Sequence, residues 1–161
     1  MKPKRKTILV MIAIVIMSGG VFFFKKVTTL QLKNMDHPRM ICIRISPSEQ
    51  FSVSYTHSIY REPVGEEFQV EGGMMLLKGV RTGSPGVMEY YGFQEMRGFH
   101  PMSRRLAAIY LKWGTGEGQE LTVRGKKIYL RQVGEKGDRI LLKIETVALG
   151  RYLLRRVFNN L

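Results

Sequence analysis

The sequence contains a single cysteine, Cys42, among its 161 residues. An intramolecular disulfide or a cysteine-based zinc site needs at least two cysteines, so both are excluded. No lipobox cysteine follows the apolar N-terminal segment, which also excludes a lipoprotein. The three histidines include no pair at metal-ligand spacing. We therefore expect no bound metal ion and no other cofactor.

Cys42 alternates with isoleucines in the stretch from Met40 to Ile45. In a strand, the isoleucines would share one face, and Cys42 would share the other face with Arg44. A cation beside an exposed cysteine can make its thiol reactive. The simpler interpretation is an inert structural cysteine.

Acidic residues are scarce, with 13 Asp and Glu against 26 Lys and Arg, so the formal net charge is +13. Residues 1–26 hold six basic residues and no acidic one, which leaves a smaller excess for the rest. Such a surface suits anionic lipid headgroups or an acidic partner, although a simple solvated surface also explains it. No basic stripe is interleaved with aromatic residues, so we expect no nucleic-acid partner.

One long segment without charge, residues 7–24, follows four basic residues and ends at Lys25-Lys26. Its length is near the lower limit of about 20 residues for a membrane-spanning helix. A cleaved signal peptide is the alternative, because Ser18, Gly19 and Gly20 offer a small-residue cleavage site. The apolar run continues to Phe24, which favours an uncleaved anchor. The basic residues before it favour a cytoplasmic N-terminus.

This pattern predicts three parts and a location at the cell membrane. Residues 1–26 form a membrane anchor or signal sequence, residues 27–39 form a linker, and residues 40–161 form a β-rich domain. We expect a single-pass protein whose C-terminal domain is extracytoplasmic.

The remaining sequence repeats with a period of two more often than 3.6. In residues 51–59, apolar side chains alternate with hydroxyl-bearing ones, which is typical of a half-buried strand. Glycine-rich turns separate further expected strands at 41–45, 68–70, 74–80, 106–113, 120–123, 127–131 and 140–147. The predicted fold is mainly β: a small antiparallel β-sandwich or partly open barrel, preceded by one N-terminal transmembrane helix.

Two segments depart from the strand pattern. Residues 83–103 are rich in glycine, proline and aromatic side chains, which predicts a long loop that packs as a flap over one end of the sheet. Residues 147–161 predict a short basic amphipathic helix. Such a helix either lies on a membrane surface or closes the domain.

Candidate functional side chains concentrate in residues 55–67, which hold one histidine, several hydroxyls and three carboxylates. We expect the strand over 51–59 to turn back at Pro63–Gly65. A histidine paired with a glutamate can act as a general base, so the candidates for catalysis are His57, Ser58, Glu62 and Glu66. His57 lies on the apolar face, which instead predicts a buried ring satisfied by a carboxylate or carbonyl, or a ligand contact without catalysis. We assign no catalytic residue.

The residues Phe51–Ser58, followed by Glu62-Pro63-Val64 and Glu66-Glu67-Phe68, resemble the signature of the family catalogued as domain of unknown function 1850. The resemblance covers roughly residues 40–130. The loop at Thr82–Val87 departs from the Gly-Ala-Gly run that is more usual in the family. A backbone role for this loop is therefore not carried over.

The resemblance implies a small secreted or membrane-anchored prokaryotic protein, often encoded beside TAXI-class TRAP transporters. No activity is established for the family, so the resemblance leaves the question of an enzyme open. By position, it indicates a set of binding or interface residues: Tyr55, His57, Ser58, Glu62 and Glu66, with Glu67 as the alternative to Glu66.

Two main functional hypotheses follow. The first is an accessory protein of a solute transporter, which binds the permease or the solute-binding protein. The second is an extracytoplasmic enzyme, most simply a hydrolase, that uses His57 with a nearby glutamate. A third and plainer hypothesis is a structural module of the cell envelope.

Overall fold

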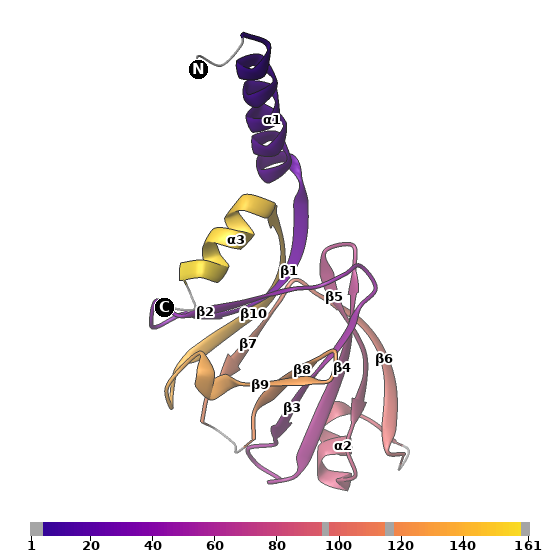
Figure 1. Cartoon of the computed structure of the whole chain (residues 1–161). Helices are drawn as coiled ribbons and strands as arrows, with labels where there is room; N and C mark the ends of the chain where they lie inside the picture. Colours follow the sequence, from indigo (N-terminus) through magenta and orange to yellow (C-terminus); the bar gives the residue numbers. More distant parts are fainter. Residues whose placement is uncertain (1–4, 95–96, 115–117, 159–161) are drawn as a thin grey trace.

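The computed structural model describes residues 5–94, 97–114 and 118–158. It contains three α-helices, ten strands and a 3-10 helix within these residues (Figure 1). In chain order these are α1 (Arg5–Phe24), β1 (Lys26–Asn34), β2 (Met40–Arg44), β3 (Gln50–Thr56), β4 (Pro63–Glu71), β5 (Met74–Arg81), α2 (Pro85–Tyr91), β6 (Phe99–Leu106), β7 (Ala108–Lys112), β8 (Glu120–Val123), β9 (Lys126–Tyr129), η1 (Leu130–Gln132), β10 (Arg139–Ala148) and α3 (Leu149–Phe158).

The strands form two antiparallel sheets. The smaller sheet has the order β2-β1-β10-β7, and the larger has the order β6-β5-β4-β3-β8-β9. Neither sheet closes into a barrel. The prediction of a mainly β, sandwich-like fold is therefore confirmed.

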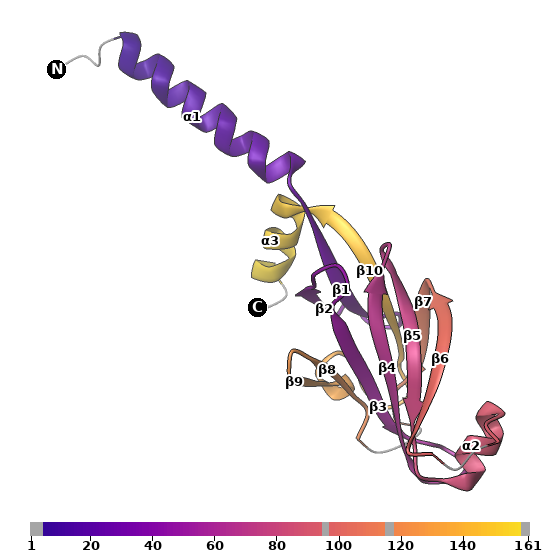
Figure 2. The ribbon, with the colours of Figure 1, turned by 90° about the vertical axis from the view of Figure 1, so that its right-hand side faces the viewer.

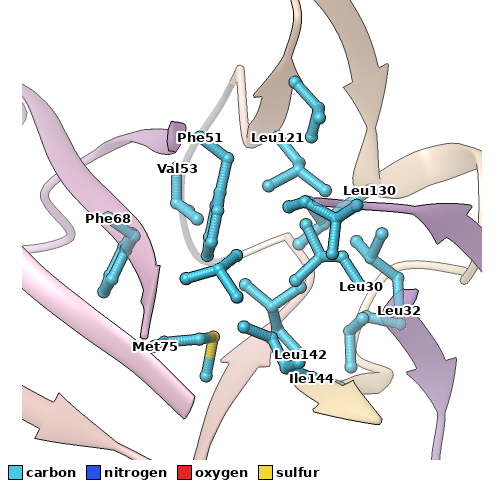
Figure 3. Close-up of a cluster of buried hydrophobic side chains, with 14 of the residues drawn as sticks. Leu30, Leu32, Phe51, Val53, Phe68, Met75, Leu121, Leu130, Leu142 and Ile144 are labelled. Carbon is cyan, nitrogen blue, oxygen red and sulfur yellow. The ribbon is translucent and has the colours of Figure 1, made fainter. Parts of the chain in front are cut away.

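The core lies where the two sheets face each other (Figure 3). Leu30, Leu32 and Leu142 from the smaller sheet are fully buried there. From the larger sheet, the rings of Phe51 and Phe68 stack with centroids 5.2 Å apart. Each large apolar side chain buried in this way contributes about 1.5–3 kcal/mol. The period of two in the sequence thus reflects side chains that point alternately into this core and away from it.

The segment expected to be a linker, residues 27–39, contains most of strand β1. This strand lies between β2 and β10, inside the smaller sheet. Because several residues of β1 are polar, the sequence pattern did not predict a strand here. Thr29 Oγ1 donates to the carbonyl of Glu145 at 2.9 Å, and Gln31 Nε2 donates to the Glu145 carboxylate. Because these buried polar groups are hydrogen-bonded, the sheet tolerates their side chains in its interior.

The turn between β3 and β4 lies earlier than expected. The strand predicted over 51–59 ends at Thr56, and β4 begins at Pro63. Backbone hydrogen bonds close the turn, from the His57 N–H to the Glu62 carbonyl at 2.8 Å and from the Arg61 N–H to the His57 carbonyl at 2.9 Å. The prediction of a turn at 63–65 is therefore wrong, because these bonds turn the chain before the proline.

The long loop predicted over residues 83–103 contains a helix and the start of a strand among the residues that the structure describes. Ser84 caps the N-terminus of α2, Pro85 occupies its first turn, and Gly92 ends it with a left-handed φ of 76°. Strand β6 then begins at Phe99. Helix α2 lies at the end of the domain farthest from α1, and it buries Val87 against the larger sheet (Figure 2).

Helix α1 is long and apolar enough to cross a membrane. It leads into β1 through Lys25, whose carbonyl accepts a hydrogen bond of 2.7 Å from the N–H of Leu149 at the start of α3. Tyr152 of α3 is buried against Val27 and Val147. Helix α3 therefore closes the α1 end of the sandwich.

Cys42 lies beside this small cluster and is half-buried. Burial raises the pKa of its thiol above the ordinary value, although Arg155 opposes the shift. A thiol that stays protonated is a poor nucleophile. The structure thus favours the inert interpretation over the reactive one.

Candidate functional site

A cleft of about 370 Å³ opens at the end of the domain that carries α2. Its walls come from the end of β3 and the following turn, from β4, from the last turn of α2, from β7 and from the residue before β8. The lining residues are Tyr55, Thr56, His57, Ser58, Glu66, Tyr90, Tyr91, Ile109, Tyr110, Leu111, Lys112 and Gln119.

Glu66 places a carboxylate on the core-facing side of the larger sheet. In the strand register it stands opposite Val53 on one side and Val80 on the other, and both valines are buried. Its Oε1 accepts a hydrogen bond of 2.7 Å from the Tyr91 hydroxyl and a longer one of 3.3 Å from the Tyr55 hydroxyl. The two hydroxyls are 2.7 Å apart. Two phenols from different elements therefore hold one carboxylate.

Burial, followed by the nearby Glu66 charge, raises the pKa of both Tyr55 and Tyr91 well above the ordinary value for a phenol. Both hydroxyls remain protonated at neutral pH and can act as donors. Among the described residues, no Lys, Arg or His lies within ion-pair distance of Glu66. The adjacent Glu67 differs, because Arg81 Nη2 approaches its carboxylate to 2.8 Å.

His57 is 7 % exposed and begins the turn after β3. Its Nδ1 accepts long hydrogen bonds of 3.4 Å from the backbone N–H groups of Ile59 and Tyr60. The ring packs edge-on against Tyr90, with centroids 4.9 Å apart. The ring is buried as predicted, but backbone N–H groups satisfy it instead of a carboxylate or carbonyl. Within the described part of the chain, no carboxylate contacts the His57 ring.

The structure brings together four of the six predicted site residues. Tyr55, His57, Ser58 and Glu66 all line the cleft. Glu62 is exposed, and its recorded contact is through its backbone carbonyl. Glu67 lies on the opposite face of β4 and pairs with Arg81, as alternation along a strand requires.

Sequence reasoning missed the polar or aromatic residues that later segments of the chain bring to the cleft: Tyr90, Tyr91, Tyr110, Lys112 and Gln119. Tyr90 and Tyr91 stood in the expected flap, so their aromatic character was the available signal. Gln119 is 7 % exposed, and its Nε2 donates to the Lys112 carbonyl at 3.1 Å. Its Oε1 has no partner among the described residues. Nothing in the sequence around Gln119 marks it.

A second buried histidine lies close to this region. His100 on β6 is 5 % exposed, and its ring stacks on Phe93 with centroids 4.1 Å apart. Its Nε2 has no hydrogen-bond partner within the described ranges. His100 is not among the residues that line the cleft. Across residues 5–94, 97–114 and 118–158, no group of three or more His, Cys, Asp or Glu could hold a metal ion.

Comparison with protein families matches residues 51–130 of the chain. The match is to a domain of unknown function, DUF1850. Every residue that lines the cleft lies within the DUF1850 segment, whereas α1, β1 and β10 lie outside it. Neither a curated protein nor a solved structure matches the chain. The smaller sheet is thus built largely from residues outside the DUF1850 segment.

Proposed function

We propose that the protein is a membrane-anchored, extracytoplasmic accessory protein of a solute transporter of the TRAP/TAXI type. The cleft would dock the solute-binding protein or the permease. The observation that supports this proposal most directly is that α1 and α2 lie at opposite ends of the molecule (Figure 2), and that Tyr90 and Tyr91 of α2 line the cleft.

Strand β1 provides the scale of this separation. It starts next to α1 at Lys26, opposite Ala148, and ends at Asn34, opposite Ile140. Eight residues of strand span about 26 Å. Lys112 of the cleft stands opposite Arg139, one residue farther along β10. If α1 is in the membrane, the cleft faces a partner that approaches from the aqueous side, which suits the solute-binding protein better than the buried part of a permease.

The arrangement of the cleft favours docking over catalysis. Ser58 is exposed, and no hydrogen bond joins it to His57 among the described residues. His57 Nδ1 accepts from backbone N–H groups, and no carboxylate of the described residues contacts the ring to orient it as a base. A hydrolase needs a nucleophile and a base within hydrogen-bond reach. An interface needs aromatic side chains around a polar centre, which Tyr90, Tyr91 and Tyr110 supply.

Site-specific photo-crosslinking in the native membrane tests this proposal. A photoreactive phenylalanine analogue replaces Tyr110, which is 71 % exposed at the mouth of the cleft. The matched control replaces Lys126, which is exposed on β9 near Cys42 and Tyr152. We expect the Tyr110 position to capture a solute-binding protein or permease, and the Lys126 position to capture neither.

Two results would contradict the proposal. One is an equal crosslinking pattern at both positions. The other is a protein that is isolated alone from its native membrane and hydrolyses a small ester or amide, with the activity lost in His57→Ala. The second result would support the enzyme hypothesis instead.

A further inference from the structure

The cleft has an acceptor-rich interior, and no Lys, Arg or His among the described residues forms an ion pair with its carboxylate, Glu66. Glu66 is half-buried on the core-facing side of β4 with no ion pair, in a chain whose formal net charge is +13. Burying a carboxylate without a counter-charge is costly. The two phenols reduce this cost, but both contact the same oxygen, Oε1. The other oxygen, Oε2, has no recorded donor in the described part of the chain.

Gln119 supplies a second, independent acceptor. Its amide is oriented by the bond from Nε2 to the Lys112 carbonyl, which leaves Oε1 as the group without a partner. Buried acceptors are nearly always hydrogen-bonded in folded proteins. The Gln119 side chain is more than nine-tenths buried and lines the cleft. Its unpartnered Oε1 therefore indicates that a bound ligand supplies the missing donor.

The walls of the cleft suit a positive charge. Tyr55, Tyr90, Tyr91 and Tyr110 line it, and the Tyr90 and Tyr91 rings meet edge to face with centroids 5.5 Å apart. Aromatic faces attract ammonium and guanidinium groups within about 6 Å. An anion would instead meet the Glu66 charge, and the phenol hydroxyls that could bind it already donate to Glu66 or to each other. The lining residues include one cation, Lys112, on the exposed side of β7.

We infer that the cleft binds a nitrogen cation, an alkylammonium or a guanidinium, between the Glu66 carboxylate and Oε1, the side-chain amide oxygen of Gln119. This inference rests on the proposed function, because it names the chemistry by which the docking cleft recognises its partner. The cation is a Lys or Arg side chain of the partner protein, because Tyr110, which lines the cleft, is 71 % exposed and free for a protein surface to cover.

The test uses the full chain in neutral detergent micelles, with ring-labelled tyrosine followed by NMR. The probes all contain a straight chain of four carbon atoms: n-butylammonium, n-butylguanidinium, uncharged n-butanol and anionic n-butyrate. We expect the two cations to bind at least about tenfold more tightly than n-butanol or n-butyrate. Because this comparison uses the wild-type protein, it does not depend on whether any variant folds.

Two adjacent glutamates provide matched variants. Glu66→Gln keeps the shape and the acceptor for Tyr91 but removes the charge, and it should weaken n-butylammonium binding about tenfold or more. Glu67→Gln removes a neighbouring charge that faces the other side of β4, and binding should change by less than about twofold. The inference is overturned if n-butanol binds as tightly as n-butylammonium, or if Glu67→Gln weakens binding as much as Glu66→Gln.

Short blocked peptides with a central Lys or Arg test whether the cation is a protein side chain. Binding of these peptides at least as tight as that of n-butylammonium supports a partner side chain. Binding of the free amine with exclusion of the peptides would refute a partner side chain and assign the cleft to a small organic cation. Crosslinking of a transporter component at Tyr110 without any preference for cations would retain the proposed function and refute this inference alone.

Discussion

Glu66 occupies a position on β4 where the strand pattern calls for an apolar side chain. Its cross-strand neighbours Val53 and Val80 belong to the core. A carboxylate persists there because Tyr55 and Tyr91 donate to it at the edge of the cleft. Single residues with this conflict between pattern and chemistry are frequently functional.

Replacing Tyr91 with phenylalanine tests how much the phenols stabilise Glu66. The change removes a hydrogen bond to a charged group, so the free energy of unfolding should fall by about 1.5–3 kcal/mol. Urea unfolding measures the difference. Tyr110→Phe is the control, because Tyr110 is 71 % exposed and its loss should change stability by less than about 0.5 kcal/mol. Equal effects of the two changes would show that the Tyr91 hydrogen bond contributes nothing.

The ion pair of Asp36 with Arg139 predicts that the free energy of unfolding falls at acid pH. Hydrogen bonds from the Arg139 side chain and backbone N–H lower the pKa of its carboxyl from 3.8 to about 2. A lowered pKa in the folded state means that the ionised form stabilises the fold above about pH 4, and that this contribution is lost as the pH falls toward about 2. Asp36→Asn should therefore be less stable than the wild type at about pH 6, with the gap narrowing toward about pH 2.

Urea unfolding at several pH values measures this gap. A gap that stays constant down to about pH 2 would contradict the assignment.

At the scale of elements, β5 and β6 join through an irregular stretch. The register between them shifts between Leu77 and Gly79, and the Phe99 ring crosses directly over Gly79. The guanidinium carbon of Arg81 lies over the Phe99 ring, 5.2 Å from its centroid. Because β6 follows α2, this crossing helps to position the helix that supplies Tyr90 and Tyr91.

Gly79→Ala should disrupt this junction. An added Cβ would overlap the Phe99 ring and lie 2.7 Å from the His100 carbonyl oxygen, a backbone atom that cannot move freely. We expect a loss of about 1–3 kcal/mol in the free energy of unfolding, measured by urea or heat. Gly83→Ala is the control, because no atom lies within 4 Å of its added Cβ. A neutral Gly79→Ala would show that Phe99 has room to move.

At the scale of the whole molecule, the chain runs from α1 through Lys25 into a strand inside the smaller sheet. Helix α3 returns to the same end, where Leu149 bonds the Lys25 carbonyl. These contacts leave little free chain between α1 and the sandwich. If α1 spans a membrane, as proposed, this short connection would hold the cleft at a set height above the membrane surface.

Cysteine labelling tests the expected topology. Glu135 follows η1, and its side chain is 67 % exposed. We expect Glu135→Cys, in a Cys42→Ser background, to react with a membrane-impermeant maleimide in intact cells, because the domain is proposed to be outside. The Cys42→Ser protein alone is the control. Labelling only after cell lysis would place the domain in the cytoplasm and refute the proposed location.

The period of two in residues 51–59 and 140–147 predicted two strands, because burial on one face imposes alternation. The structure has both, although β3 ends at Thr56. The apolar run in residues 7–24 likewise predicted a helix of spanning length. Local patterns therefore determined the fold class, the N-terminal helix and the stretch that contains Tyr55, His57 and Glu66.

Only the tertiary structure decided which residues meet. The sequence did not predict β1, because its polar residues Thr29 and Gln31 are stabilised by hydrogen bonds to β10, which is distant in the chain. Tyr91 and Gln119 join Glu66 in the cleft from segments 25 and 53 residues away, and no local pattern encodes that meeting. Hydrogen bonds between distant segments depend on how the sheets pack, so the site became visible only in the folded chain.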